Sequence, residues 1–156
     1  MTNTETFTEH ATFTIEREYP VTPAKVFRAW SDPDAKARWF ACHDDWRSEG
    51  HALDFRAGGS EMLDTYPSNG EEVHAYRAHY YDVVPNVRIV YAYEMYLGEA
   101  RMSVSLATVL FEPYGGGTRM TFTEQLVMFD ARWDAASREL GTREGLENLG
   151  RELARA

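Results

Sequence analysis

The stretch that decides the fold is DARWDAASRELGTREGLENLGRELARA, which runs from Asp130 to Ala156. Within it, Leu146, Leu149 and Leu153 recur at spacings of three and four residues. Charged residues fill the other side, a pattern typical of an amphipathic helix with one buried face. No earlier part of the chain has a helical pattern of this length. The strands that precede it must therefore pack against this helix.

The same stretch carries a second apolar face. Trp133, Ala136 and Leu140 share a side that, at about 100° per residue, points nearly opposite to the leucines. One straight helix cannot bury both sides. Because Gly141 and Gly145 lie at the junction, the sequence predicts either a break or kink there or a short separate helix before the main one. We expect the part after the glycines to pack on the sheet and the part before them to shape the mouth of a cavity.

Length and composition indicate one globular domain. The chain has 156 residues, of which 44% are hydrophobic, enough for a proper core. We expect residues 1–10 to form a flexible N-terminus and residues 11–156 to form the domain. Aromatic residues make up 13% of the chain, with nine Tyr and four Trp. Such residues on strands indicate either a polar-edged pocket or an amphipathic sheet face.

Charge and targeting patterns narrow the partners and the location. A formal net charge of −9 argues against nucleic acid and anionic membranes, which both require a basic surface. We find no signal peptide and no apolar run near the ~20 residues of a membrane-spanning helix, so we expect a cytoplasmic protein without membrane insertion. The single cysteine, Cys42, excludes an intrachain disulfide and fits a reducing compartment.

The N-terminal third predicts a strand followed by two short helices. Residues 12–19 alternate strictly between apolar and polar, as in a half-buried strand, with Arg17 on the apolar side. Thr22 and Pro23 then form a cap and a first-turn proline for one helix. Asp32 and Pro33 do the same for a second helix that follows immediately.

Six further strands form a meander before the final helix. They are expected over His51–Arg56, Ser60–Tyr66, Glu72–Val84, Val87–Leu97, Arg101–Glu112 and Thr118–Val127. A meander has one face to bury, and the last helix is long enough to cover it. The predicted fold is therefore α+β, a curved antiparallel sheet wrapped around a long C-terminal helix, with two short helices after the first strand.

Several motifs within this order carry a resemblance to a known family. They are PAKVFRAW (residues 23–30) followed by Asp32-Pro33 and Trp39-Phe40, DFRAGG (54–59), YYDVVP (80–85) and GTRMTFTE (117–124). With them the chain resembles the START-like superfamily (SRPBCC, polyketide cyclase and lipid transport). Within that superfamily it is similar to the C-terminal domain of the activator of heat-shock protein 90 ATPase. One departure is Leu146, where many relatives carry Trp.

The resemblance implies a helix-grip fold with a cavity between sheet and helix that takes a hydrophobic small molecule. It implies no universal catalytic set. Because first and last strands are neighbours in this fold, Arg17 and Glu124, both at otherwise apolar alternation positions, are candidates for a buried salt bridge facing the cavity. The alternative is that a bulge or strand end turns one or both to solvent.

Apolar side chains supply the other cavity candidates. They are Trp39, Phe40, Phe55, Met62, Tyr76, Tyr91, Tyr93, Met95, Phe122, Met128 and Trp133. Aromatic alternation is usually packing, so we expect about a third of the set to contact a ligand.

No metal or cofactor site is expected. His43, His51, His74 and His79 lack the spacing of zinc ligands, although strand histidines could converge with Asp44 or Asp45. Adjacency of Cys42 and His43 does not orient a base toward the thiol. The glycine clusters at residues 58–59 and 115–117 are hairpin turns, because neither precedes a helix as a phosphate loop does.

Three functions remain open from the sequence. The first is a binding protein for a small hydrophobic or aromatic ligand. The second is a small cofactor-independent enzyme, cyclase-like or hydrolase-like, using a cavity Glu, Arg, His or Tyr as acid or base. The third is an interaction module like the chaperone ATPase activator. Exposed aromatics and sheet edges also permit a homodimer.

Overall fold

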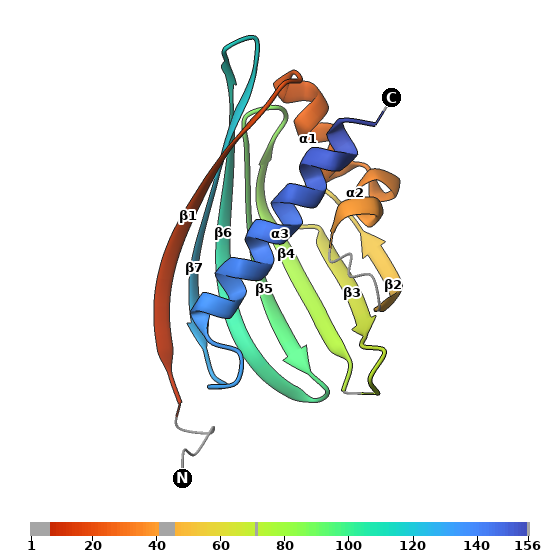
Figure 1. Cartoon of the computed structure of the whole chain (residues 1–156), viewed down its shortest axis with the longest axis vertical. Coiled ribbons are helices and arrows are strands. Elements are labelled where there is room, and N and C mark those ends of the chain that lie inside the picture. Colours follow the sequence, from red (N-terminus) through yellow and green to blue (C-terminus); the bar gives the residue numbers. More distant parts are fainter. Residues whose placement is uncertain (1–6, 41–45, 71, 156) are drawn as a thin grey trace.

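The computed structural model describes residues 7–40, 46–70 and 72–155 (Figure 1). Along the chain the elements are β1 (Glu9–Tyr19), α1 (Pro23–Ser31), α2 (Pro33–Trp39), β2 (Arg47–Leu53), β3 (Ser60–Tyr66), β4 (His74–Val84), β5 (Arg88–Leu97), β6 (Ala100–Tyr114), β7 (Gly117–Met128) and α3 (Ala135–Leu153). This confirms the predicted order of one strand, two short helices, six strands and a long helix.

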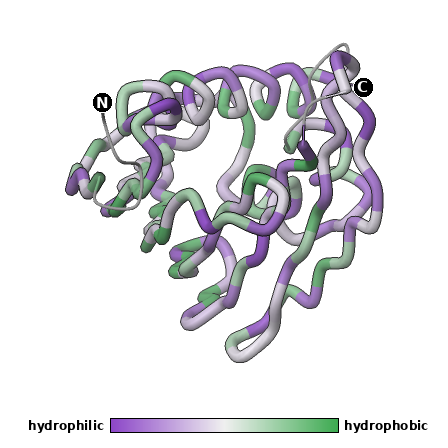
Figure 2. Tube along the Cα trace, turned by 90° about the horizontal axis from the view of Figure 1, so that it is seen from below, coloured by the Kyte–Doolittle hydropathy of each residue, from purple (hydrophilic) through white to green (hydrophobic). Residues whose placement is uncertain are grey.

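The strands form one antiparallel sheet in the order β1-β7-β6-β5-β4-β3-β2. Register shifts interrupt β4 near Tyr80 and β5 near Met95, and such bulges bend a sheet. The sheet curves around α3, which crosses its concave side, while α1 and α2 close one end (Figure 1). Hydropathy alternates along the strands, as a sheet with one buried face requires (Figure 2). The predicted α+β helix-grip architecture is confirmed.

The two short helices begin where the capping pattern predicted. The Thr22 hydroxyl accepts a hydrogen bond from the Lys25 backbone N–H at 3.2 Å, and Pro23 occupies the first turn. Asp32 caps the second helix in the same way, with the Asp34 N–H at 3.0 Å. Both caps satisfy backbone donors that a helix start leaves unpaired. The two helices therefore follow each other directly, with Asp32 alone between them.

The long helix α3 is unbroken, so the predicted break at Gly141 and Gly145 is wrong. Trp133 lies in the turn before the helix, whose N-cap is Asp134. Leu140 is 60% exposed. The second apolar face therefore has no need to be buried within the helix, and one straight helix can bury the leucine side alone. Glycine weakens a helix without ending it when packing holds the flanking turns.

Most strand boundaries differ from the sequence prediction by one or two residues, and those of β2 and β1 differ most. β2 spans Arg47–Leu53 rather than His51–Arg56, because residues 54–59 form a turn closed by the Arg56 N–H on the Asp54 carbonyl at 3.1 Å. β1 begins at Glu9. The predicted flexible N-terminus falls mostly on residues 1–6, which lie outside the described residues, as do Cys42, His43, Asp44 and Asp45.

Helix α3 is fastened to the sheet and to α2 by polar contacts along its length. The Ala135 N–H donates to the Glu9 carboxylate at 2.8 Å. In the middle, the Tyr19 hydroxyl donates to the Leu146 carbonyl at 3.1 Å. Near the C-terminal end, the Arg38 guanidinium binds both carboxylate oxygens of Glu152 at 2.7 to 2.9 Å. These contacts attach the start and the middle of the helix to β1 and its C-terminal end to α2.

Candidate functional site

A cavity of about 390 Å³ lies between the concave sheet face, α2 and α3. Its wall is formed by Trp30, Trp39, Phe40, Trp46, Leu63, Thr65, His74, Tyr76, Tyr91, Tyr93, Met95, Met102, Phe122, Glu124, Met128, Trp133, Asp134, Ser137, Arg138, Gly141, Thr142, Gly145 and Leu146. Most of these side chains are apolar or aromatic. Among the polar ones, Glu124 lies on β7 and Ser137, Arg138 and Thr142 on α3, whereas Thr65 and His74 lie on β3 and β4.

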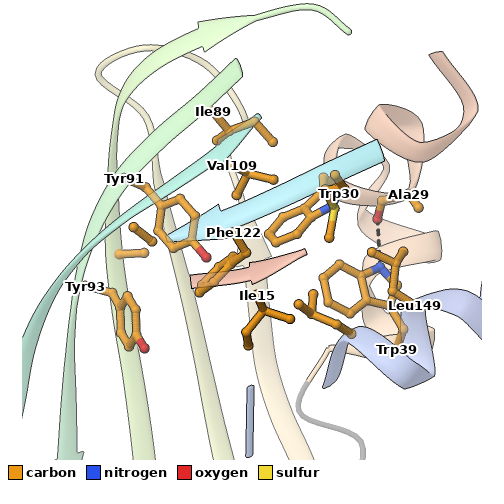
Figure 3. Close-up of a cluster of buried hydrophobic side chains, with 14 of the residues drawn as sticks. Ile15, Ala29, Trp30, Trp39, Ile89, Tyr91, Tyr93, Val109, Phe122 and Leu149 are labelled. Carbon is orange, nitrogen blue, oxygen red and sulfur yellow. Dashed lines mark hydrogen bonds between the residues drawn. The ribbon is translucent and has the colours of Figure 1, made fainter. Parts of the chain in front are cut away.

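Aromatic rings form much of the wall. Tyr76 and Tyr93, on the neighbouring strands β4 and β5, have ring centroids 5.0 Å apart. Phe40, at the end of α2, meets the Tyr76 ring edge-on at 4.9 Å. Tyr91 and Tyr93 stand one beyond the other on β5, and Trp30 faces them from the helical side (Figure 3). These rings offer flat surfaces and edges against which another ring can stack.

Next to this wall, the part of the core beside α1 and α2 is closely packed. Trp30 and Trp39 meet edge to face with centroids 4.9 Å apart, and the Trp39 indole N–H donates to the Ala29 carbonyl at 2.9 Å (Figure 3). Leu149 from α3 packs in the same region and is fully buried. The helical pair thus closes the cavity at that end.

Arg138 of α3 organises the polar part of the wall. One of its terminal nitrogens lies 3.3 Å from Oε2 of Glu124 and 3.1 Å from the Tyr93 hydroxyl. The other donates to the Ser103 hydroxyl at 2.7 Å. The Tyr93 and Ser105 hydroxyls each donate to Oε2 of Glu124 at 2.7 Å. An arginine on the helix and a carboxylate on β7 are therefore joined through β5 and β6.

Charges in this network are held in fixed states. Burial by itself would lower the pKa of the Arg138 guanidinium, but Tyr93 and Glu124 beside it raise that pKa above its ordinary value. Burial raises the pKa of the Tyr93 phenol well above its usual range. Arg138 therefore remains a cation and Tyr93 a neutral donor at any physiological pH. A buried carboxylate beside a paired arginine gives the cluster no net charge.

The network leaves one oxygen of the buried carboxylate without a protein partner. Glu124 is fully buried, yet its Oε1 receives no hydrogen bond from any described residue. The Tyr76 hydroxyl, also in the cavity wall, is likewise buried and without a partner there. Because buried polar atoms are nearly always hydrogen-bonded, these two atoms mark positions where the cavity can accept a polar group.

Two helix glycines form part of the wall. A Cβ placed on Gly141 or on Gly145 would meet no atom within 4 Å. Both glycines line the cavity, and Gly141 is also exposed to solvent. The glycines therefore widen the cavity rather than bring the helix closer to the sheet.

Most of the predicted cavity residues do line the cavity. They are Trp39, Phe40, Tyr76, Tyr91, Tyr93, Met95, Phe122, Glu124, Met128 and Trp133. Phe55 lies elsewhere, between Phe27 and Tyr80, where it is partly buried and packs against the core. Met62 is 42% exposed on the outer side of the sheet.

The predicted pair of Arg17 and Glu124 does not form. In the register of β1 and β7, Arg17 lies opposite Met120, four residues along the strand from Glu124. At about 3.3 Å per residue, this separates them by roughly 13 Å. Arg17 instead reaches Glu147 of α3 at 3.5 Å. Glu124 faces the cavity as predicted, but its cation comes from the helix.

The residues missed by the sequence prediction are Arg138, Ser103 and Ser105. A signal existed for each of them. The two serines occupy inward positions of β6, two residues apart. Arg138 lies eleven residues before Leu149, which places it about 20° from that leucine on the helix wheel. Polar residues at positions that face the core thus indicate the polar part of the cavity wall.

A second buried polar network lies at the other edge of the sheet. Lys36 of α2 donates to Oε1 of Glu61 at 2.6 Å and to the Tyr80 hydroxyl at 3.2 Å. His51 of β2 contacts Oε2 of Glu61 at 2.8 Å. Both Lys36 and Glu61 side chains are completely buried. Every polar atom of this ion pair has a partner, so the network joins α2, β2, β3 and β4 structurally.

The histidines take separate positions. His51 belongs to the Glu61 network, His79 is exposed, and His74 lies at the cavity wall between the rings of Trp46 and Trp133. Within the described residues, no three His, Cys, Asp or Glu side chains are grouped so that they could hold a metal ion. None of the described helices is long and apolar enough to cross a membrane.

Solved structures similar to this chain agree with the fold. An uncharacterised protein from Rhizobium leguminosarum is 53% identical, with a TM-score of 0.90 over 96% of this chain and 98% of that one. Protein Mll3558 from Rhizobium loti is 42% identical, with a TM-score of 0.85 over 94% and 99%. An AHSA1-like protein from Aeromonas hydrophila, 24% identical, has a TM-score of 0.71 over 92% of each chain and shares the fold.

Residues 20–156 match the family model described as activator of Hsp90 ATPase homolog 1-like protein. No curated protein matches the chain. The matched residues include every residue that lines the cavity. The chain belongs to the family of activator of Hsp90 ATPase homolog 1-like proteins, within the START-like (SRPBCC) superfamily.

Proposed function

We propose that this protein binds a small hydrophobic or aromatic molecule in the cavity between the sheet and α3. The observation that carries the proposal is the cavity of about 390 Å³ between the sheet and α3, lined mostly by apolar and aromatic side chains. Protein interiors are close-packed and contain few voids larger than a water molecule. Small-molecule sites usually measure about 300–1,000 Å³ and are mainly apolar with a few placed polar groups. This cavity has both properties.

The cavity is built into the sequence of α3. Gly141 and Gly145 each lower helix propensity, and a side chain at either position would have room. A helix that served only to seal the sheet would gain stability from larger residues there. The loss of helix stability caused by the two glycines is therefore explained if a ligand occupies the space beside them. The family also supports a ligand-binding type of domain.

Native mass spectrometry of the purified protein, followed by a calorimetric screen of hydrophobic and aromatic compounds, tests the proposal. The matched variants are Gly145→Phe, which places a ring in the cavity, and Leu140→Phe, which places it on the exposed side of the same helix. We expect Gly145→Phe to weaken binding about tenfold or more, ~1.4 kcal/mol, and Leu140→Phe to leave it unchanged. Equal affinity in both variants, or no ligand in either experiment, contradicts the proposal.

The network around Glu124 favours a second candidate, a small enzyme that uses this carboxylate as a general base. Its Oε1 is buried without a hydrogen-bond partner among the described residues, and the residue lines the cavity. Turnover of a bound aromatic ester or polyketide-like compound that disappears in Glu124→Gln, with binding retained, would establish this activity. Binding without any turnover would contradict the enzyme and leave small-molecule binding as the function.

A further inference from the structure

The arrangement of hydrogen bonds on Glu124 specifies the polarity of the ligand. The described donors to this carboxylate all converge on Oε2: the Tyr93 hydroxyl, the Ser105 hydroxyl and Arg138. Oε1 of the same group is buried and receives none from the described residues. A carboxylate oxygen accepts hydrogen bonds and donates none. A group that enters next to Oε1 must therefore bring a hydrogen.

The surrounding charge restricts this donor further. Arg138 already balances the charge of Glu124 at 3.3 Å, so the pair is neutral as a unit. A ligand ammonium would add an uncompensated cation beside buried Arg138, and a ligand carboxylate would set an anion against Oε1. A neutral O–H or N–H meets neither penalty. The donor expected here is uncharged.

The aromatic walls define the rest of the ligand. Tyr76 and Tyr93 stand with ring centroids 5.0 Å apart, and Phe40 presents its edge to Tyr76 at 4.9 Å. Flat rings pack on such surfaces by offset stacking or edge contacts. A volume of about 390 Å³ lies toward the lower end of the range of small-molecule sites, so the ligand has few rings.

Resting on the proposed function, we infer that the ligand is a neutral, hydroxylated aromatic compound whose O–H donates to Oε1 of Glu124. The Tyr76 hydroxyl is the second polar contact. Burial raises the pKa of Tyr76 well above its usual range, so this phenol stays protonated and can donate to a ligand oxygen. One acceptor and one donor in an aromatic wall match a phenol or an aromatic alcohol.

Four probes with one ring system separate hydrogen-bond donation from size. Naphthalene has no polar group, 2-naphthol can donate and accept, 2-methoxynaphthalene can only accept, and 2-ethylnaphthalene has the bulk of the ether without its oxygen. Dissociation constants are measured by calorimetry at pH 7 on the full chain. We expect the wild type to bind 2-naphthol about tenfold or more tighter than the ether, because a hydrogen bond to a charged group is lost.

Glu124→Gln reverses the polarity at the same position. The amide oxygen keeps the donors of the network, which leaves its N–H₂ group at the position of Oε1. Naphthol and ether oxygens can both accept from that group, so their affinities should become equal, while naphthalene binds both proteins alike. Glu147→Gln is the matched control. It makes the same change from carboxylate to amide on the exposed side of α3, outside the cavity, and should keep the tenfold preference.

The outcomes separate this inference from the proposed function. If all four probes bind the wild type tightly without a preference for 2-naphthol, the inferred O–H donation to Glu124 is overturned. The proposal of small-molecule binding is then unaffected. A preference that survives in folded Glu124→Gln also overturns it. Absence of binding by every probe overturns the inference together with the aromatic ligand class. If Glu124→Gln does not fold, the wild-type ratio of naphthol to ether decides alone.

Discussion

The ion pair of Lys36 and Glu61 shows what single buried charges contribute to this protein. Both side chains are completely buried, with Nζ and Oε1 2.6 Å apart. Removing one partner of such a pair leaves the other charge without compensation and costs about 3–5 kcal/mol. We therefore expect Lys36→Met to lower the free energy of unfolding by about this amount in urea titrations. Arg56→Met, which breaks an exposed pair with Asp54, should change it by less than about 1 kcal/mol. Similar losses in the two variants would contradict the prediction.

Acid should weaken the same network. Burial by itself would raise the pKa of the Glu61 carboxyl, but Lys36 and the hydrogen bonds with His51 and Tyr80 lower it to about 2, below the ordinary 4.5. Because the folded-state pKa is the lower one, the stabilisation is complete above about pH 4.5. It is lost as the pH falls toward 2, by an amount on the order of 3 kcal/mol.

Urea titrations between pH 7 and pH 3 measure this effect. The free energy of unfolding of the wild type should decline through the acid range more steeply than that of Glu61→Gln, which has no proton to take up there. Parallel declines would show that other carboxylates account for the acid sensitivity.

At the scale of elements, the glycines of α3 and of the β-hairpins have opposite roles. A Cβ on Gly141 would meet nothing within 4 Å, whereas one on Gly117 would lie 2.2 Å from the Tyr19 carbonyl oxygen. Gly141→Ala should raise the free energy of unfolding by about 0.5–1 kcal/mol through helix propensity. Thermal unfolding should then show a small rise in Tm. The same substitution at Gly117 should lower Tm, because β1 and β7 must separate. A lower Tm for Gly141→Ala would mean that the helix is strained at that point.

Helix α3 also carries the residue that completes the site. Arg138 crosses from the helix to three strands, and the cavity polarity depends on that one helical turn. The continuity of α3 matters for this reason, since a break after Leu140 would free the segment that carries Arg138. The single face of the helix thus both seals the core and presents the cation.

At the scale of the whole molecule, the ligand should stabilise the fold by mass action. A ligand that binds only the folded state contributes about 2.7 kcal/mol at 100 times its Kd. For a chain of 156 residues this corresponds to a Tm increase of roughly 5–10 °C. Differential scanning fluorimetry with 2-naphthol measures it, and Gly145→Phe at the same ligand concentration should show little increase. Calorimetric binding without any Tm increase would place the ligand outside the folded core.

The order of elements was predictable because each one is encoded locally. The caps at Thr22 and Asp32, the alternation of residues 12–19 and the glycine turns each depend on neighbours within a few residues. The helix of Leu146, Leu149 and Leu153 depends on one face alone. Prediction failed where two local signals competed, as at Leu140, whose exposure removed the need for a second buried face.

In the candidate site, too, some features follow from local sequence and others from tertiary contacts. Alternation in β5 and β7 by itself determined that Tyr91, Tyr93, Phe122 and Glu124 face inward, because side-chain direction in a strand follows from position. Only the tertiary structure decided which cation meets Glu124. That choice depends on strand register and on the placement of α3, which arise from contacts between residues far apart in the chain. The sequence therefore determined a grip around a helix, and the packing decided that the helix brings Arg138 to one oxygen of Glu124 and leaves the other for a ligand.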